Sequence, residues 1–372
     1  MHKQVANINY LGFWLVSGFM SLISHTLLSI PPTIFLFLIS MFFLTLTLIN
    51  KPRIEYHNIL FIPILFIIYL LTTQPFFFPS LHRVFGLLCS FLYIVPVVYF
   101  GSKLKTQELE KVINFFIIFS FIILVSEGIS RLIDPEMKYA QFKGVDSRWI
   151  YMYKFDGIMY TDSNATGLHI ICLFFFILYW AREREKKFLF IRWGLIILLI
   201  FTFSRAAWLG AIIGLIYIYG FKGKYFKRFI IFMSTSGIIV AFLGIGYSKI
   251  SGDISFLSKL YILETTYDYL KSADIMNLIF GVGFFKSEEV LGIYGHNIFI
   301  VFLLESGIIG LTFILMLFSS FVYYTRKKAL WVLIPYLVTS FSAITTFVPY
   351  LYGTVGLIYL IEQSKLNRHK CK

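Results

Sequence analysis

The residues best suited to chemistry are a histidine and the asparagine after it, placed where a polar stretch gives way to a long apolar one. A histidine imidazole gains and loses a proton near neutral pH, so His296 could take a proton from a hydroxyl group. Glycines flank the pair, and the whole set is Gly281, Gly283, His296, Asn297, Gly307 and Gly310. The first two glycines permit a tight turn before the histidine.

A simpler interpretation of the same residues remains open. Asn297 could cap a helix, His296 could belong to an interfacial belt, and Gly307 and Gly310 could let two helices pack closely. Neither interpretation is excluded by the His-Asn pair alone.

Three cations are candidates for binding an anionic substrate group. Arg205 follows a serine between two apolar stretches, and its guanidinium could fork onto phosphate oxygens. Lys259 and Arg148 lie in two long polar segments. In the alternative interpretation, Arg205 anchors a helix end at lipid headgroups, and the two loop cations are simply solvated.

The spacing of the motif resembles that of a known family. His296-Asn297, nine further residues and Gly307-x-x-Gly310, preceded by Gly281-x-Gly283, are similar to the motif of the O-antigen ligase and polymerase superfamily of bacterial membrane glycosyltransferases. Two more segments resemble the family, at its Ser-Arg step and at an Asn-containing helix start: Ser204-Arg205 and Asp162-Ser163-Asn164. The resemblance covers the whole expected topology and is specific to these motifs over about 162–310.

The resemblance implies a mechanism. The family transfers a glycan from undecaprenyl pyrophosphate to an acceptor sugar hydroxyl, which needs a base for the hydroxyl and positive charge for the leaving pyrophosphate. His296 matches the base and Arg205 the phosphate binder. The family also carries an arginine in its long loop, whereas here Lys259 stands at that place and Arg148 is the alternative. The sequence contains no Asp-x-Asp pair for a nucleotide-sugar's metal, so no metal or cofactor is expected.

The same resemblance suggests partners and leaves alternatives. We expect a lipid-linked oligosaccharide as substrate, the lipid bilayer as solvent, a chain-length regulator and a flippase as possible partners, and no nucleic acid. A polymerase of repeat units is preferred over a ligase that moves the glycan to lipid A-core. A transporter or lipid-linked sugar flippase with twelve helices is the alternative from another class.

The composition predicts the elements that must position these residues. Of 372 residues 58% are hydrophobic and only 14% are charged, and the apolar residues recur in stretches of about 16 to 22, near the length that crosses a hydrocarbon core. We therefore expect one all-α integral membrane domain of about twelve helices, GT-C-like, with both termini cytoplasmic. The expected spans are 10–29, 33–49, 59–73, 84–100, 112–132, 165–181, 188–204, 206–221, 229–246, 297–318, 329–347 and 350–361.

Charge sets the expected orientation. Although the net charge is +14, the lysines and arginines form short clusters between apolar stretches, and about two thirds of them fall on one side of the expected topology. That side would be the cytoplasm of a bacterial inner membrane. The other side receives two long external segments, 133–164 and 247–296, of which the second lies between helices nine and ten and would be periplasmic. We expect a short amphipathic helix near 258–271.

Two acidic residues lie inside expected spans, where an unpaired charge is costly. Glu305 could orient a ligand group or pair internally, and its helical phase argues against contact with His296. Glu127 carries no motif and is interpreted as a packing or helix-pairing residue.

Overall fold

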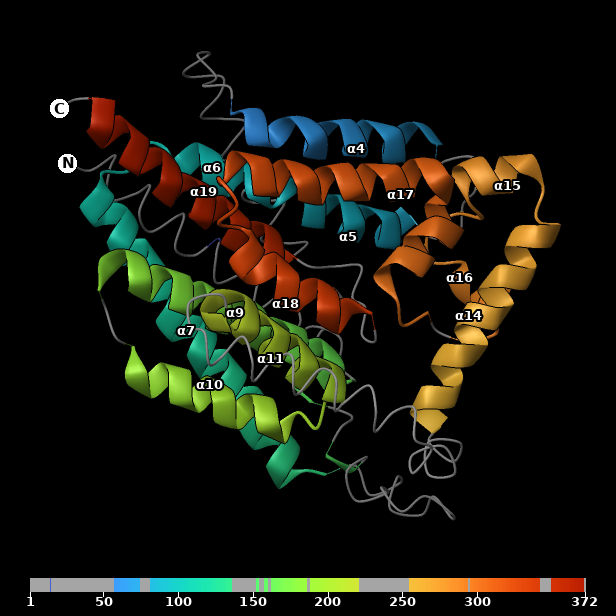
Figure 1. The fold of residues 1–372 in the computed structure, drawn as a ribbon, viewed down its shortest axis with the longest axis horizontal. Helices are drawn as coiled ribbons and strands as arrows, with labels where there is room; N and C mark the ends of the chain where they lie inside the picture. Colours follow the sequence, from blue (N-terminus) through green and yellow to red (C-terminus); the bar gives the residue numbers. More distant parts are fainter. Residues whose placement is uncertain are drawn as a thin grey trace.

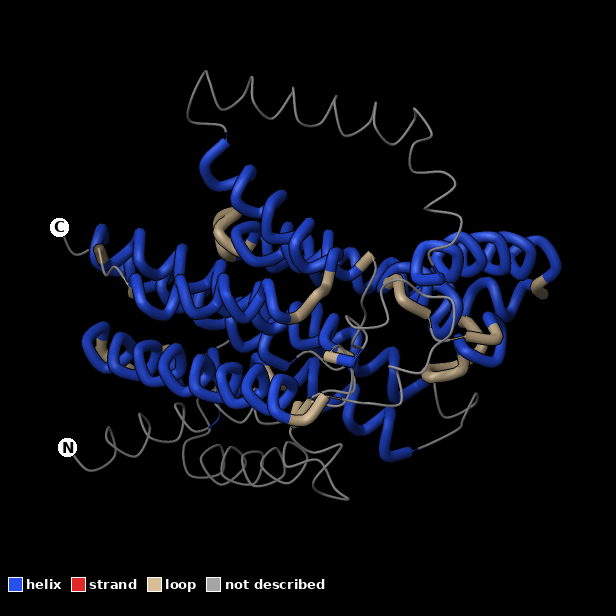
Figure 2. The backbone as a smooth tube through the Cα atoms, turned by 90° about the horizontal axis from the view of Figure 1, so that it is seen from below, coloured by secondary structure: helices blue, strands red, loops and turns tan. Residues whose placement is uncertain are grey.

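The computed structural model describes Trp14 and residues 57–73, 81–135, 152–153, 157–159, 162–185, 188–220, 254–293, 295–341 and 349–370. All regular elements within these residues are helices, as the sequence predicts (Figure 2). The expected spans 33–49 and 229–246 lie outside the described residues, and so does 10–29 apart from Trp14. The number of twelve spans is therefore a prediction still.

The helices follow the expected apolar stretches with shifted ends. They are α4 (Phe61–Thr73), α5 (Leu81–Leu92), α6 (Ile94–Gly101), α7 (Thr106–Ile133), α9 (Ser163–Arg184), α10 (Leu189–Phe201), α11 (Arg205–Tyr219), α14 (Ile254–Ser272), α15 (Ile275–Phe280), α16 (Ser287–Leu291), α17 (Ile298–Tyr324), α18 (Leu330–Ser340) and α19 (Pro349–Lys370), with a 3-10 turn at Asn58–Leu60. Helices α7, α9 and α17 are long and apolar enough to cross a membrane. The protein thus has the helices of an integral membrane protein.

Helix α9 is the centre of the bundle. Every residue from Ala165 to Ala181 is buried, and α7, α10, α11, α18 and α19 all pack against it. A helix that is apolar on all sides can bury its whole surface only among other helices. Of the three long apolar helices, α9 is the most deeply buried, and it runs through the bundle between its neighbours (Figure 1).

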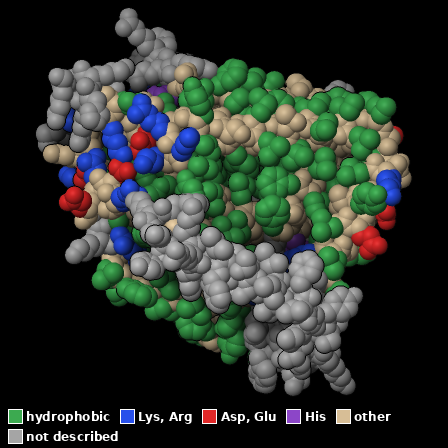
Figure 3. Space-filling view, viewed as in Figure 1, with side chains coloured by type: hydrophobic (Ala, Val, Ile, Leu, Met, Phe, Trp, Pro, Cys, Tyr) green, Lys and Arg blue, Asp and Glu red, His purple; other side chains and the backbone are tan. Residues whose placement is uncertain are grey.

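One end of the bundle gathers basic residues. The guanidinium of Arg184, at the end of α9, lies 3.0 Å from the carboxylate of Glu110 near the start of α7, and Lys365 of α19 pairs with Glu183. Arg182 stacks over the Trp331 ring at the start of α18. Basic side chains cluster at this end in the space-filling view, whereas the face over α4 and α17 is largely hydrophobic (Figure 3). Basic residues that the sequence places on one side of a membrane thus lie together. We call this part of the bundle, with Arg182, Arg184 and Lys365, the basic end.

One expected span is two helices. The sequence predicts a single helix over 84–100, but α5 ends at Leu92 and α6 begins at Ile94 after a turn at Tyr93. Pro96 explains the correction, because its ring has no N–H to donate to the carbonyl of Leu92 and collides with it.

Helix α17 is interrupted at Gly307, which the sequence does not predict. The residue has φ 64° and ψ −168°, far from helical values, so the backbone carbonyls before it lose their helical partners. Tertiary donors replace them: Val282 N–H reaches Leu304 O at 2.9 Å, Gly283 N–H reaches Glu305 O at 3.0 Å, and the Tyr69 hydroxyl reaches Ser306 O at 2.8 Å. A break inside an apolar helix is tolerable when protein satisfies the backbone in this way.

A glycine at position 307 is required on two counts, conformation and space. A Cβ there would overlap the carbonyl of Ile279 in α15, in addition to straining a positive φ. Gly307→Ala should lower thermal stability severely, because backbone must move to admit the methyl group. Gly292→Ala is the matched control: it also has φ 68°, yet a Cβ there meets only the Tyr261 hydroxyl at 3.6 Å, so a cost of about 1–3 kcal/mol is expected. Equal melting temperatures in detergent for the two variants would contradict the close contact at Gly307.

Candidate functional site

The starts of α9 and α11 meet at the end of the bundle opposite the basic end. Asp162 caps α9 by accepting from Asn164 N–H at 2.9 Å, and Ser204 caps α11 by accepting from Ala207 N–H at 3.3 Å. The Ser204 hydroxyl also donates to the Asn164 side-chain oxygen at 2.6 Å. Two segments chosen for separate motifs are thus hydrogen-bonded, and Arg205, the first residue of α11, is exposed beside them.

The His-Asn pair stands at the start of α17. Asn297 is its N-cap, and its side-chain oxygen accepts from Phe299 N–H at 2.9 Å and Ile300 N–H at 3.3 Å. The interpretation from the sequence that Asn297 caps a helix is therefore confirmed. This arrangement leaves His296, directly before the cap, half-buried and outside the helix.

The end of α18 lies between these two groups. The Phe341 ring, just after α18, packs on Phe299 of α17 with centroids 5.5 Å apart, and the Thr339 hydroxyl lies 3.4 Å from Ala206 O in the first turn of α11. Helices α11 and α18 approach closely because α11 carries glycines at the contact: a Cβ on Gly214 would lie 2.9 Å from Pro335 Cβ. The start of α17, which follows His296, and the start of α11, which is Arg205, thus both lie against the end of α18.

The four glycines of the motif serve two purposes. Gly281 and Gly283 shape a turn, whereas Gly307 and Gly310 lie at and just after the break in α17. Gly281 (φ 79°) and Gly283 (φ 105°) form the expected turn, and this turn docks on the break of α17. A Cβ on Gly281 would overlap the backbone of Glu305 and Ser306. Gly310 follows one turn after the break and is buried beside Ser306 and Tyr69.

Of the two loop cations, the structure describes Lys259. Lys259 is half-buried on α14, and α14 packs against α16. The helix expected at 258–271 is confirmed and longer, but it is not cleanly amphipathic, since Leu257, Leu263 and Tyr267 are all exposed. Arg148 lies outside the described residues. Burial and then the carboxylate of Asp274 raise the pKa of the Tyr269 phenol on α14 above its usual value.

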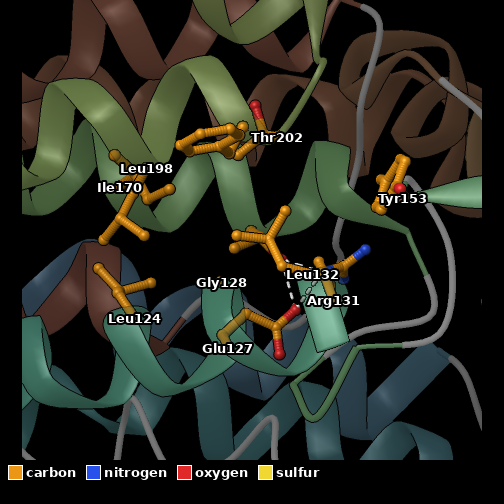
Figure 4. Close-up of a pocket in the computed structure, with 11 residues that line it drawn as sticks. Leu124, Glu127, Gly128, Arg131, Leu132, Tyr153, Ile170, Leu198 and Thr202 are labelled. Atoms are coloured by element: carbon orange, nitrogen blue, oxygen red, sulfur yellow. Dashed lines mark hydrogen bonds and ion pairs between the residues drawn. The ribbon is translucent and has the colours of Figure 1, made fainter. Parts of the chain in front are cut away.

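A buried ion pair near the site was not anticipated from the sequence. On α7, Arg131 Nε lies 2.6 Å from Glu127 Oε1, and the two side chains are 5% and 0% exposed. The Glu127 carboxylate also accepts from the Thr166 hydroxyl of α9 at 3.2 Å and from Met159 N–H at 2.7 Å. Figure 4 shows the two side chains turned toward each other, with Tyr153 across the pocket.

The pocket beside this pair is small, with room for about one water molecule. Its remaining walls are mostly apolar and come from α7, α9 and α10: Leu124, Gly128, Leu132, Ile170, Leu198, Phe201 and Thr202. Because the carboxylate is already saturated with protein donors, the pair is suited to fixing α7, α9 and residues 157–159 relative to one another. The sequence signal was the i, i+4 spacing of opposite charges in an apolar helix.

A double-mutant cycle should reveal this pair. Glu127→Ala leaves the Arg131 guanidinium buried without its carboxylate and should cost roughly 3–5 kcal/mol. The double variant Glu127→Ala/Arg131→Ala should cost clearly less than the sum of the single variants. Stability of the purified protein in detergent measures both, and strictly additive losses would show that the two charges are not coupled.

Arrangement and composition define the class of the protein as a helical membrane protein with a polar cluster at one end of its bundle. Neither a comparison with protein-family models nor one with curated sequences gives a match. The family resemblance therefore depends on the motif residues themselves.

Proposed function

We propose that this protein is a membrane glycosyltransferase that joins lipid-linked glycan units, with His296 as the base and Arg205 as the binder of the departing pyrophosphate. The acceptor hydroxyl would lose its proton to the imidazole while it attacks the anomeric carbon, and the bond to the pyrophosphate oxygen would break. The guanidinium would stabilise the charge that develops on that oxygen. The donor would be an undecaprenyl-pyrophosphate oligosaccharide, and the site would face the periplasm of a bacterial inner membrane.

This proposal is supported by two contacts that bring the starts of α17 and α11 to the end of α18, namely Phe299 against Phe341 and the Thr339 hydroxyl 3.4 Å from Ala206 O. Residues 91 positions apart in the sequence are brought to one end of the bundle, opposite the basic end. A lipid-linked donor presents its pyrophosphate at the headgroup level, and this is where the starts of α9, α11 and α17 would lie.

A carrier remains the alternative from another class, since carriers use interrupted helices near the middle of the membrane. The break in α17 at Gly307 is a feature of this kind and supports the carrier hypothesis. Its freed carbonyls, however, are taken by Val282, Gly283 and Tyr69, so they are not available to coordinate a transported ion. The glycosyltransferase is therefore our preferred function.

Glycan analysis of a strain lacking this chain tests the proposal and separates its two forms. Single repeat units attached to the lipid A-core would indicate a lost polymerase, which is the result we expect. Long chains that remain on undecaprenyl pyrophosphate would indicate a lost ligase. Normal glycans of normal length at the surface would refute both.

A further inference from the structure

The segment that leads to His296 is attached at both ends to the first two turns of α17. At its beginning, Val282 and Gly283 donate to the carbonyls of Leu304 and Glu305. At its end, Asn297 caps the helix. The described residues of 281–297, which are 281–293 and 295–297, thus form a loop that starts and finishes on the same half-helix, 298–306.

The side chain of Glu305 fixes the middle of this loop. Its Oε1 accepts from the Ser287 hydroxyl at 2.6 Å and from Ser287 N–H at 3.4 Å, and Ser287 is the first residue of α16. Hydrogen bonds to a carboxylate are stronger than those between neutral groups. Glu305 is 2% exposed, and its Oε2 makes no hydrogen bond within the described residues. The carboxylate therefore binds the first residue of α16 and, through the backbone of Phe285, the turn just before that helix.

Helix α16 packs against the residue that precedes His296, so its position affects the position of the histidine. Leu291 at its end packs with Leu304 of α17 and Ile262 of α14 in a small buried cluster. Gly295, the residue before the histidine, lies against Leu291 and Val301, and a Cβ there would come within 3.3 Å of Leu291. A shift of α16 would consequently move the backbone that carries the imidazole.

We propose that Glu305 is a positioning residue for His296 and acts through α16. This inference rests on the proposed function, in which His296 is the base. Glu305 lies about 10 Å along the helix axis from Ile298, so it holds the loop and does not itself exchange a proton with the substrate. What it must supply is a hydrogen-bond acceptor for Ser287, and a glutamine can supply that as well.

Limited proteolysis of the purified full chain in detergent tests the attachment independently of activity. Trypsin cleaves after Lys286, which adjoins Ser287, and after Lys271 at the end of α14, which serves as the internal control. Glu305→Ala should accelerate cleavage after Lys286 at least tenfold and leave cleavage after Lys271 unchanged. Glu305→Gln should remain near the wild type. Ser287→Ala removes the hydroxyl donor without opening a large cavity, so it should give an intermediate rate even if Glu305→Ala folds poorly.

Turnover then tests the positioning role. Glu305→Ala should lower kcat at least tenfold with an unchanged KM for the lipid-linked donor, and Glu305→Gln should restore it. Equal defects in both variants would overturn the inference, because the charge itself would then be needed. Unchanged cleavage after Lys286 in Glu305→Ala would overturn it as well. Accelerated cleavage together with full activity of His296→Ala would instead refute the proposed function and leave the attachment of α16 intact.

Discussion

Replacing His296 with alanine should abolish long-chain polysaccharide while the protein remains in the membrane at its normal level. His296 is half-buried and lies directly before α17, so the variant keeps Asn297 as the cap of that helix. Without a base, transfer should fall by a factor of about 10² to 10⁴. Gel analysis of surface glycans and immunoblotting of membranes measure the two quantities.

His57→Ala is the control for this variant. His57 stands directly before the short 3-10 turn that leads into α4 and makes no side-chain capping bond there, and its ring lies 3.3 Å from the Tyr359 hydroxyl of α19. Glycan length should not change. If His296→Ala also keeps normal glycans, His296 is not the base.

Arg205→Ala should give the second largest effect. Removing a preorganised donor to developing negative charge typically costs a factor of about 10² to 10³ in turnover. Arg205→Lys should recover only part of it, because an ammonium is a point charge without the planar fork that binds two phosphate oxygens. Transfer rates measured with purified protein and lipid-linked donor provide the comparison.

Arg326→Ala is the matched control, since Arg326 is an exposed arginine at the basic end and the neighbouring Lys327 and Lys328 keep the local charge. It should transfer at the wild-type rate. A lysine at position 205 that works as well as arginine would contradict bidentate phosphate binding, although not a role for positive charge.

Helix positions could be predicted from the sequence because apolar stretches of membrane-spanning length admit little besides helix. The two corrections both concern interruptions. Pro96 gave a usable signal, since a proline disturbs the turn before it. Gly307 gave no such signal, because a glycine in an apolar helix equally indicates close packing of two helices. The break depends on the N–H groups of Val282 and Gly283, which are far from Gly307 in the sequence and reach α17 only in the folded protein.

The candidate site was predictable to the extent that its motifs lie at helix starts. Asn164, Ser204 and Asn297 were selected from the sequence, and the structure adds that the first two are bonded to each other. Internal pairing of Glu305 was one of the two expectations and is confirmed, although its partner Ser287 lies 18 residues away. Glu127 was interpreted from the sequence as a packing or helix-pairing residue, and its carboxylate does join α7 to Thr166 of α9. Its ion pair with Arg131, one turn further along α7, was not predicted.

The most direct test of the central claim is glycan transfer by the purified protein in liposomes that contain an undecaprenyl-pyrophosphate oligosaccharide as the only added substrate. We predict that the wild type lengthens the oligosaccharide and releases undecaprenyl pyrophosphate, and that His296→Ala does neither. Unchanged oligosaccharide with the folded wild type, above all if the lipid-linked glycan moves from one leaflet to the other, would contradict a glycosyltransferase and favour a carrier.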